Sequence, residues 1–139
     1  MRLLSNLEKD MILGLGIDII EIERVRNSVV KYGDHFLNKI YTETELNYCM
    51  AKGENKYQHL AARFAAKEAV FKALSTGWSK DIGWQDIEIY NEPNGMPLVK
   101  LKGEWETFLA NDKNLKISMS HSRDYVTCVA IIYKALGEN

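Results

Sequence analysis

Hydrophobic residues alternate with other residues directly after Met11, and this alternation predicts a β-strand. The segment runs from Ile12 to Glu23 and is rich in isoleucine. It places Ile17 and Ile19 on one face of the strand and Asp18 on the other face, beside two further isoleucines. We therefore expect Asp18 to share a face with residues of the core.

Four segments in the second half of the chain have a similar strand pattern. They cover residues 87–89, 98–101, 115–120 and 125–133. Asn94-Gly95 is typical of a tight turn, so the first two segments are expected to form a hairpin. The last two segments are joined through residues 121–124.

Hydrophobic residues at helical spacing follow the first strand. From Glu23 to Tyr32, Val25 and Val29 lie on one side of the predicted helix. The opposite side carries Arg24, Asn27, Ser28 and Lys31. This pattern predicts an amphipathic helix with a basic, polar surface.

Three further segments also have the spacing of helices. They extend from Thr42 to about Met50, from Lys56 to Leu74 and from Glu104 to Ala110. Thr42 followed by Glu45 resembles a capping box at the start of the first of these helices. Gly77 is expected to end the second and longest one.

The order of the predicted elements is one strand, then helices, then mostly strands. Such segregation is typical of an α+β domain rather than of a doubly wound parallel sheet. The chain has 139 residues, of which 46% are hydrophobic and 27% charged. It contains no internal repeat, which favours a single domain over residues 11–139. Residues 1–10 precede the first hydrophobic run and are expected to be an N-terminal extension.

The composition excludes several classes of protein. A chain of this length buries roughly two thirds of the surface that its unfolded form exposes, so any bound metal is expected to be functional rather than structural. No stretch of about 18 hydrophobic residues exists, so the sequence predicts neither membrane insertion nor export. The net charge of −1 argues against nucleic-acid binding.

The two cysteines, Cys49 and Cys128, lie far apart and form no CxxC motif. This spacing suggests neither a disulfide framework nor a zinc site. We therefore expect a cytoplasmic protein in a reducing environment.

A carboxylate interrupts the hydrophobic side of the longest predicted helix. Glu68 projects from a stripe formed by Tyr57, Leu60, Ala61, Phe64, Ala65 and Phe71. Burial of an unpaired carboxylate costs several kcal/mol, so Glu68 is expected to be paired, protonated or bound to a metal. Spacing alone favours an ion pair with Lys72, four residues further along the helix.

Asp18 is a second carboxylate on a hydrophobic face, this time on the first strand, so it too is expected to have a partner. The alternative to a ligand role is a strand-end aspartate that binds the backbone or an arginine. Two carboxylates from separate elements can converge, and with substrate phosphates and water they are a usual way to hold Mg²⁺. The sequence thus suggests a magnesium site formed by Asp18 and Glu68, with structural pairing as the alternative.

Glycine-rich phosphate loops are missing from the sequence. Residues 14–16 read Gly-Leu-Gly, but Ile19 stands where a third glycine would be needed, and no GxxxxGK[ST] motif occurs. Phosphate must therefore be held by side chains, and Arg63, Lys67 and Lys72 on one helix suit a polyphosphate. Each of them taken alone is more commonly part of a solvated basic face.

His121 continues the alternation of Ile117 and Met119, so spacing alone favours a partly buried histidine at a strand end. The Ser-His-Ser order at residues 120–122 is not a hydrolase triad, because neighbours on a strand point to opposite faces. No GxSxG motif occurs either.

Three segments, taken together, favour ligand roles for these residues over the structural alternatives. They are GIDIIEIER at residues 16–24, RFAAKEAVFKAL at 63–74 and SMSHS at 118–122. In this order they closely resemble the holo-acyl-carrier-protein synthases, the small phosphopantetheinyl transferases. The resemblance spans residues 12–133, and NGMP at 94–97 resembles a turn that lies near the coenzyme in that family.

The resemblance implies an α+β fold, a homotrimer and an active site between neighbouring subunits. By motif position, it implies that Asp18 and Glu68 bind Mg²⁺ and that Arg24 faces the acidic acyl carrier protein. The resemblance implies that Lys72 and His121 bind coenzyme A. The full set of residues expected to bind it is Arg63, Lys67, Lys72, Gly95, Pro97, His121 and Ser122.

The implied activity is transfer of 4′-phosphopantetheine from coenzyme A to a serine of apo acyl carrier protein in fatty acid biosynthesis. Adenosine 3′,5′-bisphosphate would be released. Lys72 would offset the charge that builds on the leaving phosphate. Either Glu68 or a metal-bound water could accept the serine proton. The side of the predicted helix that carries Arg24 and Lys31 is expected to dock the carrier.

Two other functions would use the same residues. A Mg²⁺-dependent nucleotide phosphohydrolase would replace the serine with water. A noncatalytic, oligomeric coenzyme-binding module would use Glu68 and Lys72 only as a structural pair. Incubation with coenzyme A alone separates the hydrolase from the transferase.

Overall fold

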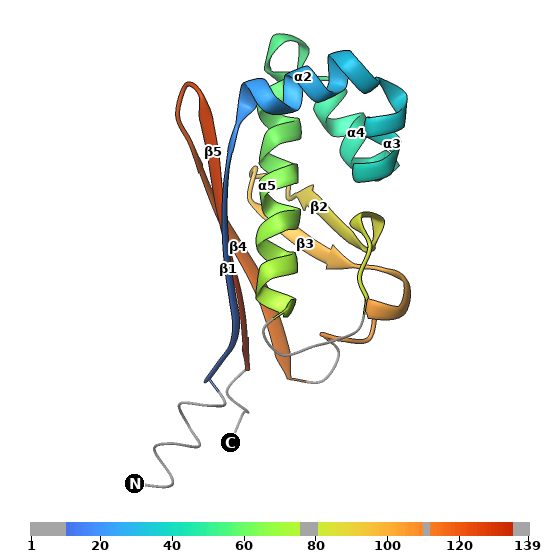
Figure 1. Ribbon diagram of the computed structural model, residues 1–139. Coiled ribbons are helices and arrows are strands. Elements are labelled where there is room, and N and C mark those ends of the chain that lie inside the picture. The colour runs from blue at the N-terminus through green and yellow to red at the C-terminus, as the bar shows by residue number, and fades with distance from the viewer. Residues whose placement is uncertain (1–10, 76–80, 110–111, 135–139) are drawn as a thin grey trace, which may run out of the picture.

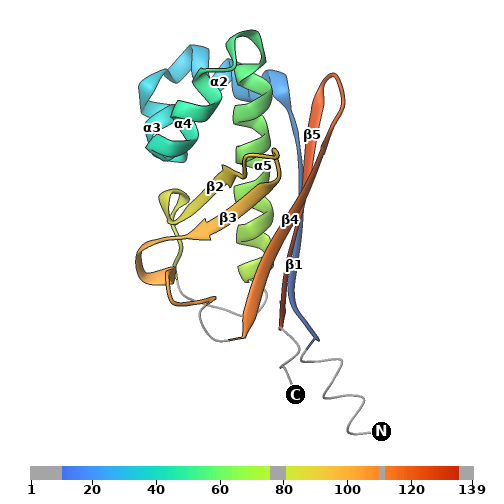
Figure 2. The ribbon, with the colours of Figure 1, turned by 180° about the vertical axis from the view of Figure 1, so that it is seen from behind.

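A long central helix organises the molecule into layers. The computed structural model describes residues 11–75, 81–109 and 112–134. Helix α5 (Lys56–Ser75) lies between a three-stranded sheet on one side and a two-stranded hairpin with three short helices on the other (Figures 1 and 2). The α+β class and the single domain with a long central helix agree with the sequence analysis.

The larger sheet is antiparallel and has the order β1-β5-β4. Its strands are β1 (Ile12–Glu21), β4 (Lys113–His121) and β5 (Tyr125–Lys134). β1 ends two residues earlier than predicted, because the amide of Ile22 donates to the carbonyl of Asp124 and begins a helix. Asp18 lies on the face of β1 that packs on α5, as expected, while Ile17 and Ile19 are more than 60% exposed on the other face.

Two glycines let β1 lie directly against the backbone of α5. A Cβ atom at Gly16 would stand 1.9 Å from the carbonyl oxygen of Ala69, and one at Gly14 would stand 2.3 Å from that of Ala73. No larger residue fits at this distance without moving the strand. This close approach brings the residues that follow Gly16 against the middle of the helix.

Three short helices cover one end of α5 (Figure 1). They are α2 (Ile22–Tyr32), α3 (Asp34–Ile40) and α4 (Glu43–Met50). The capping box predicted for α4 is confirmed: Thr42 Oγ1 accepts from the amide of Glu45, and Glu45 Oε1 accepts from the amide of Thr42. The spacing of hydrophobic residues predicted α2 and α4 but not α3, which has only seven residues.

The predicted hairpin is confirmed as β2 (Ile87–Asn91) and β3 (Pro97–Leu101). Three 3₁₀ turns complete the described structure, namely η1 (Gly53–Asn55), η2 (Trp84–Asp86) and η3 (Gly103–Trp105). The helix predicted from Glu104 is wrong, because the chain forms η3 and then further turns through residue 109. Trp105 holds this tight path: it is buried, and its indole nitrogen donates to the carbonyl of Asp81.

The core lies on both sides of α5, so this helix is buried far more widely than a single hydrophobic stripe predicts. Cys49 and Cys128 are buried and unbridged, and burial raises the pKa of their thiols to about 11 and about 12. No helix in the described ranges is long and apolar enough to cross a membrane. Gly77 and residues 1–10 lie outside the described residues.

Candidate active site

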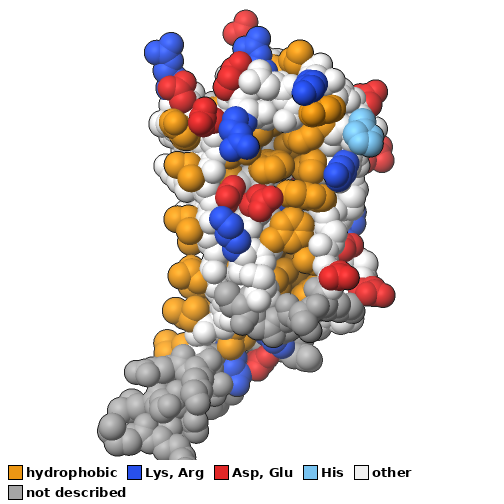
Figure 3. All heavy atoms as spheres, in the orientation of Figure 1, with side chains coloured by type: hydrophobic (Ala, Val, Ile, Leu, Met, Phe, Trp, Pro, Cys, Tyr) orange, Lys and Arg blue, Asp and Glu red, His pale blue; other side chains and the backbone are white. Residues whose placement is uncertain are grey.

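β1 and α5 bring the two predicted metal ligands to one hollow, here called the carboxylate pocket. Asp18 comes from β1 and Glu68 from α5. The pocket has a volume of about 330 Å³ and is lined by Asp18, Ile19, Ile20, Arg24, Val25, Ser28, Phe36, Phe64 and Glu68. Acidic and basic side chains lie together between β1 and α5 on this face (Figure 3). The predicted convergence of the two carboxylates is therefore observed, and Arg24 of α2 lies at the same pocket.

The two carboxylates of this pocket repel each other. Burial raises the pKa of Glu68, the nearby carboxylate of Asp18 raises it further, and Lys72 partly opposes the shift. A divalent cation would relieve this repulsion, and paired carboxylate oxygens are the donors that Mg²⁺ prefers. Within the described residues no group of three or more His, Cys, Asp or Glu side chains could hold a metal, so a Mg²⁺ ion bound here would need substrate phosphates or water to complete its ligands.

Lys72 contacts strand β1 rather than Glu68, the carboxylate on its own helix. Its ammonium donates to Asp18 Oδ1 at 3.2 Å and to the carbonyl of Ile17 at 2.9 Å. The ion pair between Glu68 and Lys72 that spacing favoured is therefore wrong. The side chain of Lys72 remains 54% exposed, so its ammonium can also reach a ligand above the pocket.

Four residues predicted to bind the coenzyme meet at a second hollow, here called the arginine pocket. They are Arg63 from α5, Gly95 and Pro97 from the hairpin, and His121 from the end of β4. The pocket has a volume of about 240 Å³. These residues are distant in the chain, and the packing of the hairpin and β4 around α5 brings them together.

Arg63 is the buried cation of this pocket. It is only 2% exposed, its guanidinium lies 4.2 Å from the ring centre of Tyr48, and it donates to Asn91 Oδ1. Its Nε has no hydrogen-bond partner among the described residues. A buried donor without a partner is costly, so an anionic ligand that accepts from Arg63 fits this pocket.

The arginine pocket also contains polar residues that were not among the predicted site residues. Gln58 Nε2 lies 3.3 Å from His121 Nε2, and Asn91 Nδ2 donates to the carbonyl of Gly95. The pKa of His59 is lowered by burial and then by the charge of Arg63. A usable signal existed for His59, because it precedes Arg63 by four residues and so lies on the same side of the helix.

A family model described as the 4′-phosphopantetheinyl transferase superfamily matches residues 14–130 of the chain. The chain belongs to this superfamily. A relative within it is the holo-[acyl-carrier-protein] synthase of Protochlamydia amoebophila, which is 48% identical over 121 residues, covering 87% of this chain and 98% of that protein.

Solved structures of the superfamily share the fold. A holo-(acyl-carrier-protein) synthase from Bacillus anthracis, in complex with CoA (3′,5′-ADP), is 33% identical with a TM-score of 0.73, covering 90% of this chain and 99% of that chain. The holo-[acyl-carrier-protein] synthase of Neisseria meningitidis is 31% identical with a TM-score of 0.79, covering 89% of this chain and all of that chain. Nearly the whole of each transferase structure is thus matched.

Lys67 lines neither the carboxylate pocket nor the arginine pocket, although it was expected to help hold the coenzyme phosphates. Its side chain is completely buried and forms an ion pair with Glu45 at 2.6 Å. It also donates to the carbonyls of Ile40 and Trp84. The expectation that Lys67 contacts the coenzyme is corrected, because its ammonium already has three partners within the protein.

Ser122 does not line the arginine pocket, although it adjoins His121. It lines a small hollow on the sheet together with His121, Ile19 and Tyr125. Its hydroxyl accepts from the amide of Tyr125, as in a turn. His121 lies at both this hollow and the arginine pocket, so it is the point where the two adjoin.

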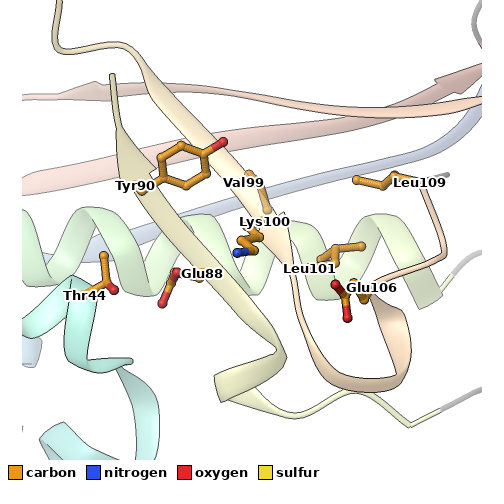
Figure 4. Close-up of a pocket in the computed structure, with 8 residues that line it drawn as sticks. All are labelled: Thr44, Glu88, Tyr90, Val99, Lys100, Leu101, Glu106 and Leu109. Atoms are coloured by element: carbon orange, nitrogen blue, oxygen red, sulfur yellow. The ribbon is translucent and has the colours of Figure 1, made fainter. Parts of the chain in front are cut away.

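A further cavity, larger than the carboxylate and arginine pockets, lies away from the predicted site residues. It has a volume of about 660 Å³ and lies over the hairpin (Figure 4). Its lining residues come from α4, β2, β3 and the segment after η3: Thr44, Glu88, Tyr90, Val99, Lys100, Leu101, Glu106 and Leu109. None of the predicted site residues lies there.

Proposed function

We propose that this chain is a holo-acyl-carrier-protein synthase, which transfers 4′-phosphopantetheine from coenzyme A to a serine of apo acyl carrier protein and releases adenosine 3′,5′-bisphosphate. The observation that carries the proposal is the carboxylate pocket, where Asp18, Glu68 and Arg24 lie together. The coenzyme fragment in the Bacillus anthracis relative supports the choice of donor.

Coenzyme A carries several phosphates, and the arginine pocket offers donors for them. Arg63 has a buried Nε without a partner, and His121 lies at the rim beside Gly95 and Pro97. Lys72 remains exposed next to Asp18 and can meet the pyrophosphate. Ser122 is proposed to contribute through its position beside His121 rather than within the arginine pocket.

Asp18 and Glu68 are the residues proposed to hold Mg²⁺. The metal would neutralise the pyrophosphate and stabilise the charge that develops in the transition state. Lys72 adds positive charge on the side of the leaving phosphate. Glu68 is also a candidate acceptor for the serine proton, because burial raises the pKa of its carboxyl group and so makes it a better proton acceptor.

The docking surface for the acidic carrier is proposed to lie on α2. Arg24 and Lys31 are exposed on this helix, and Arg24 also lines the carboxylate pocket. A carrier bound to these cations would therefore present its serine next to Asp18 and Glu68. Attraction of this kind acts locally and does not require a basic protein overall.

Assembly into a homotrimer is proposed from the outer face of the large sheet. β1 exposes Ile12, Leu15, Ile17 and Ile19, each of them at least 57% exposed in the single chain. A row of hydrophobic side chains is visible along this edge of the molecule (Figure 3). Contact with neighbouring subunits would cover it and place a pocket of one subunit beside a pocket of the next. The cytoplasmic location stays a prediction.

The test is to mix the protein with apo acyl carrier protein, coenzyme A and Mg²⁺ and to weigh the carrier by mass spectrometry. A gain equal to one phosphopantetheine, lost with Asp18→Ala or Glu68→Ala, is the expected result. Release of nucleotide from coenzyme A without a carrier would support the phosphohydrolase instead. No mass gain with any divalent metal would refute the proposal.

A further inference from the structure

The buried ammonium of Lys67 is fully occupied by protein atoms. It lies 2.6 Å from Glu45 Oε1, 2.7 Å from the carbonyl of Ile40 and 3.0 Å from the carbonyl of Trp84. An ammonium has three donors, and each one has a partner here. Lys67 therefore has no donor left for a ligand, although it stands next to Glu68 in the sequence.

The carboxylate of Glu45 is occupied in the same way. Oε1 accepts from Lys67 and from the amide of Thr42 at 2.8 Å. Oε2 accepts from the amide of Ile89 at 2.8 Å. A single buried side chain thus joins the start of α4, the middle of α5 and the strand β2.

This junction lies beside the two walls of the arginine pocket. Arg63 stands one helical turn before Lys67 on α5, and Asn91 stands two residues after Ile89 on β2. Arg63 donates to Asn91, whose amide donates to the carbonyl of Gly95. The distance between α5 and β2 at Lys67 therefore sets how Arg63 faces Asn91 and Gly95.

We propose that Glu45 and Lys67 form a positioning pair that holds α5 and β2 at the separation needed for the arginine pocket to bind coenzyme A. The proposal deepens the proposed function and rests on it, because it takes the coenzyme as the ligand of that pocket. Neither residue touches the coenzyme; both act through Arg63, Asn91 and Gly95.

The pair is directional, which distinguishes it from ordinary hydrophobic packing. Five hydrogen-bonding contacts converge on two side chains, and each contact points at a specific backbone or side-chain atom. Neutral side chains of similar size in both positions could restore stability, because a buried ion pair costs desolvation. They could not restore the directions in which Lys67 and Glu45 hold their partners.

The experiment compares three variants with a control that is destabilised at a different place in the core. The variants are Lys67→Met, Glu45→Gln and the double variant, and the control is Ile132→Ala, which opens a cavity on β5 away from both pockets. Each protein is examined for its unfolding midpoint in urea. Coenzyme A binding is measured by isothermal titration calorimetry without carrier, and KM for coenzyme A and kcat are measured with carrier.

All three variants are expected to raise the Kd and KM for coenzyme A by at least about tenfold, because a misdirected Arg63 weakens its charge-assisted hydrogen bond to the ligand, and a loss of this kind costs about that much. Their kcat at saturating coenzyme A should stay within about twofold, and Ile132→Ala should leave the Kd within about twofold. If Lys67→Met alone does not fold, the double variant supplies the result.

Two outcomes would overturn the positioning role of Glu45 and Lys67, and a third would contradict the proposed function. A Kd that follows stability, so that Ile132→Ala weakens binding as much as the variants do, would overturn the positioning role. Weaker binding with Lys67→Met but normal binding with Glu45→Gln would also overturn it and would place Lys67 on the coenzyme. A wild-type protein that binds no coenzyme A would contradict the proposed function itself.

Discussion

An alanine at Gly16 should separate the two carboxylates of the carboxylate pocket without removing either. The new Cβ atom would lie 1.9 Å from the carbonyl oxygen of Ala69, whereas ordinary contact begins at 3.4 Å. β1 must therefore move away from α5 by about 1.5 Å, because the nearest atom belongs to the helix backbone and cannot rotate away. Asp18 moves with β1, and Glu68 stays with α5.

The magnitude follows from the strict geometry of magnesium. Mg²⁺ holds its ligands at about 2.0–2.1 Å with little tolerance, so a displacement of this size prevents both carboxylates from binding one ion. A misplacement of about 1 Å costs on the order of 100-fold, which is about 2.7 kcal/mol. We expect Gly16→Ala to need about 100-fold more Mg²⁺ for half-maximal activity, measured by titration of the metal at saturating coenzyme A and carrier.

Gly14→Ala is the matched control. Its Cβ atom would meet the carbonyl of Ala73 at 2.3 Å, so it disturbs the same contact between strand and helix, but two residues further from Asp18. Both variants should lower the melting temperature, and Gly16→Ala should weaken metal binding more than Gly14→Ala does. A folded Gly16→Ala protein that binds Mg²⁺ as tightly as the wild type by calorimetry would refute the reasoning.

Three further predictions concern individual side chains. The pKa of Glu68 is raised in the folded protein, so ionisation of Glu68 destabilises the metal-free fold above that pKa, and the penalty disappears below the ordinary value of 4.5. Glu68→Gln should therefore raise the melting temperature in EDTA at pH 7, with a smaller gain near pH 4; equal melting of both proteins at pH 7 would contradict this. Arg24→Glu should raise the KM for the carrier about tenfold and leave the KM for coenzyme A unchanged, and an unchanged carrier KM would count against docking on α2. Arg63→Ala should weaken coenzyme A binding at least tenfold by calorimetry without changing Mg²⁺ affinity, and normal binding would remove the arginine pocket as the coenzyme site.

Local signals in the sequence were sufficient for most of the secondary structure. Alternation located β1, the hairpin and the last two strands, and Thr42 with Glu45 located the start of α4. The failures are short or irregular segments. α3 has only two turns, and the segment after Gly103 follows a tight path because Trp105 is buried against Asp81. Such segments depend on partners that are distant in the chain.

The face of a strand is likewise a local property, and it placed Asp18 correctly toward the core. The position of Glu68 within a hydrophobic stripe likewise predicted an unusual carboxylate. Neither pattern could show the partner, and spacing favoured Lys72 for Glu68 where the fold gives Lys72 to Asp18. The sequence motifs indicated the family, and the family implied the expected roles of these residues.

Only the tertiary structure showed that the three cations of the central helix have different surroundings. Arg63, Lys67 and Lys72 look equivalent in sequence, because a helical pattern shows which side of a helix is apolar but not what covers each side. Since α5 lies between two layers, Arg63 faces the arginine pocket, Lys67 is sealed against Glu45, and Lys72 reaches the edge of β1. The sequence by itself determined which residues carry charge and to which family the chain belongs. The packing of two layers on α5 determined which of these charged side chains remain available to bind a ligand.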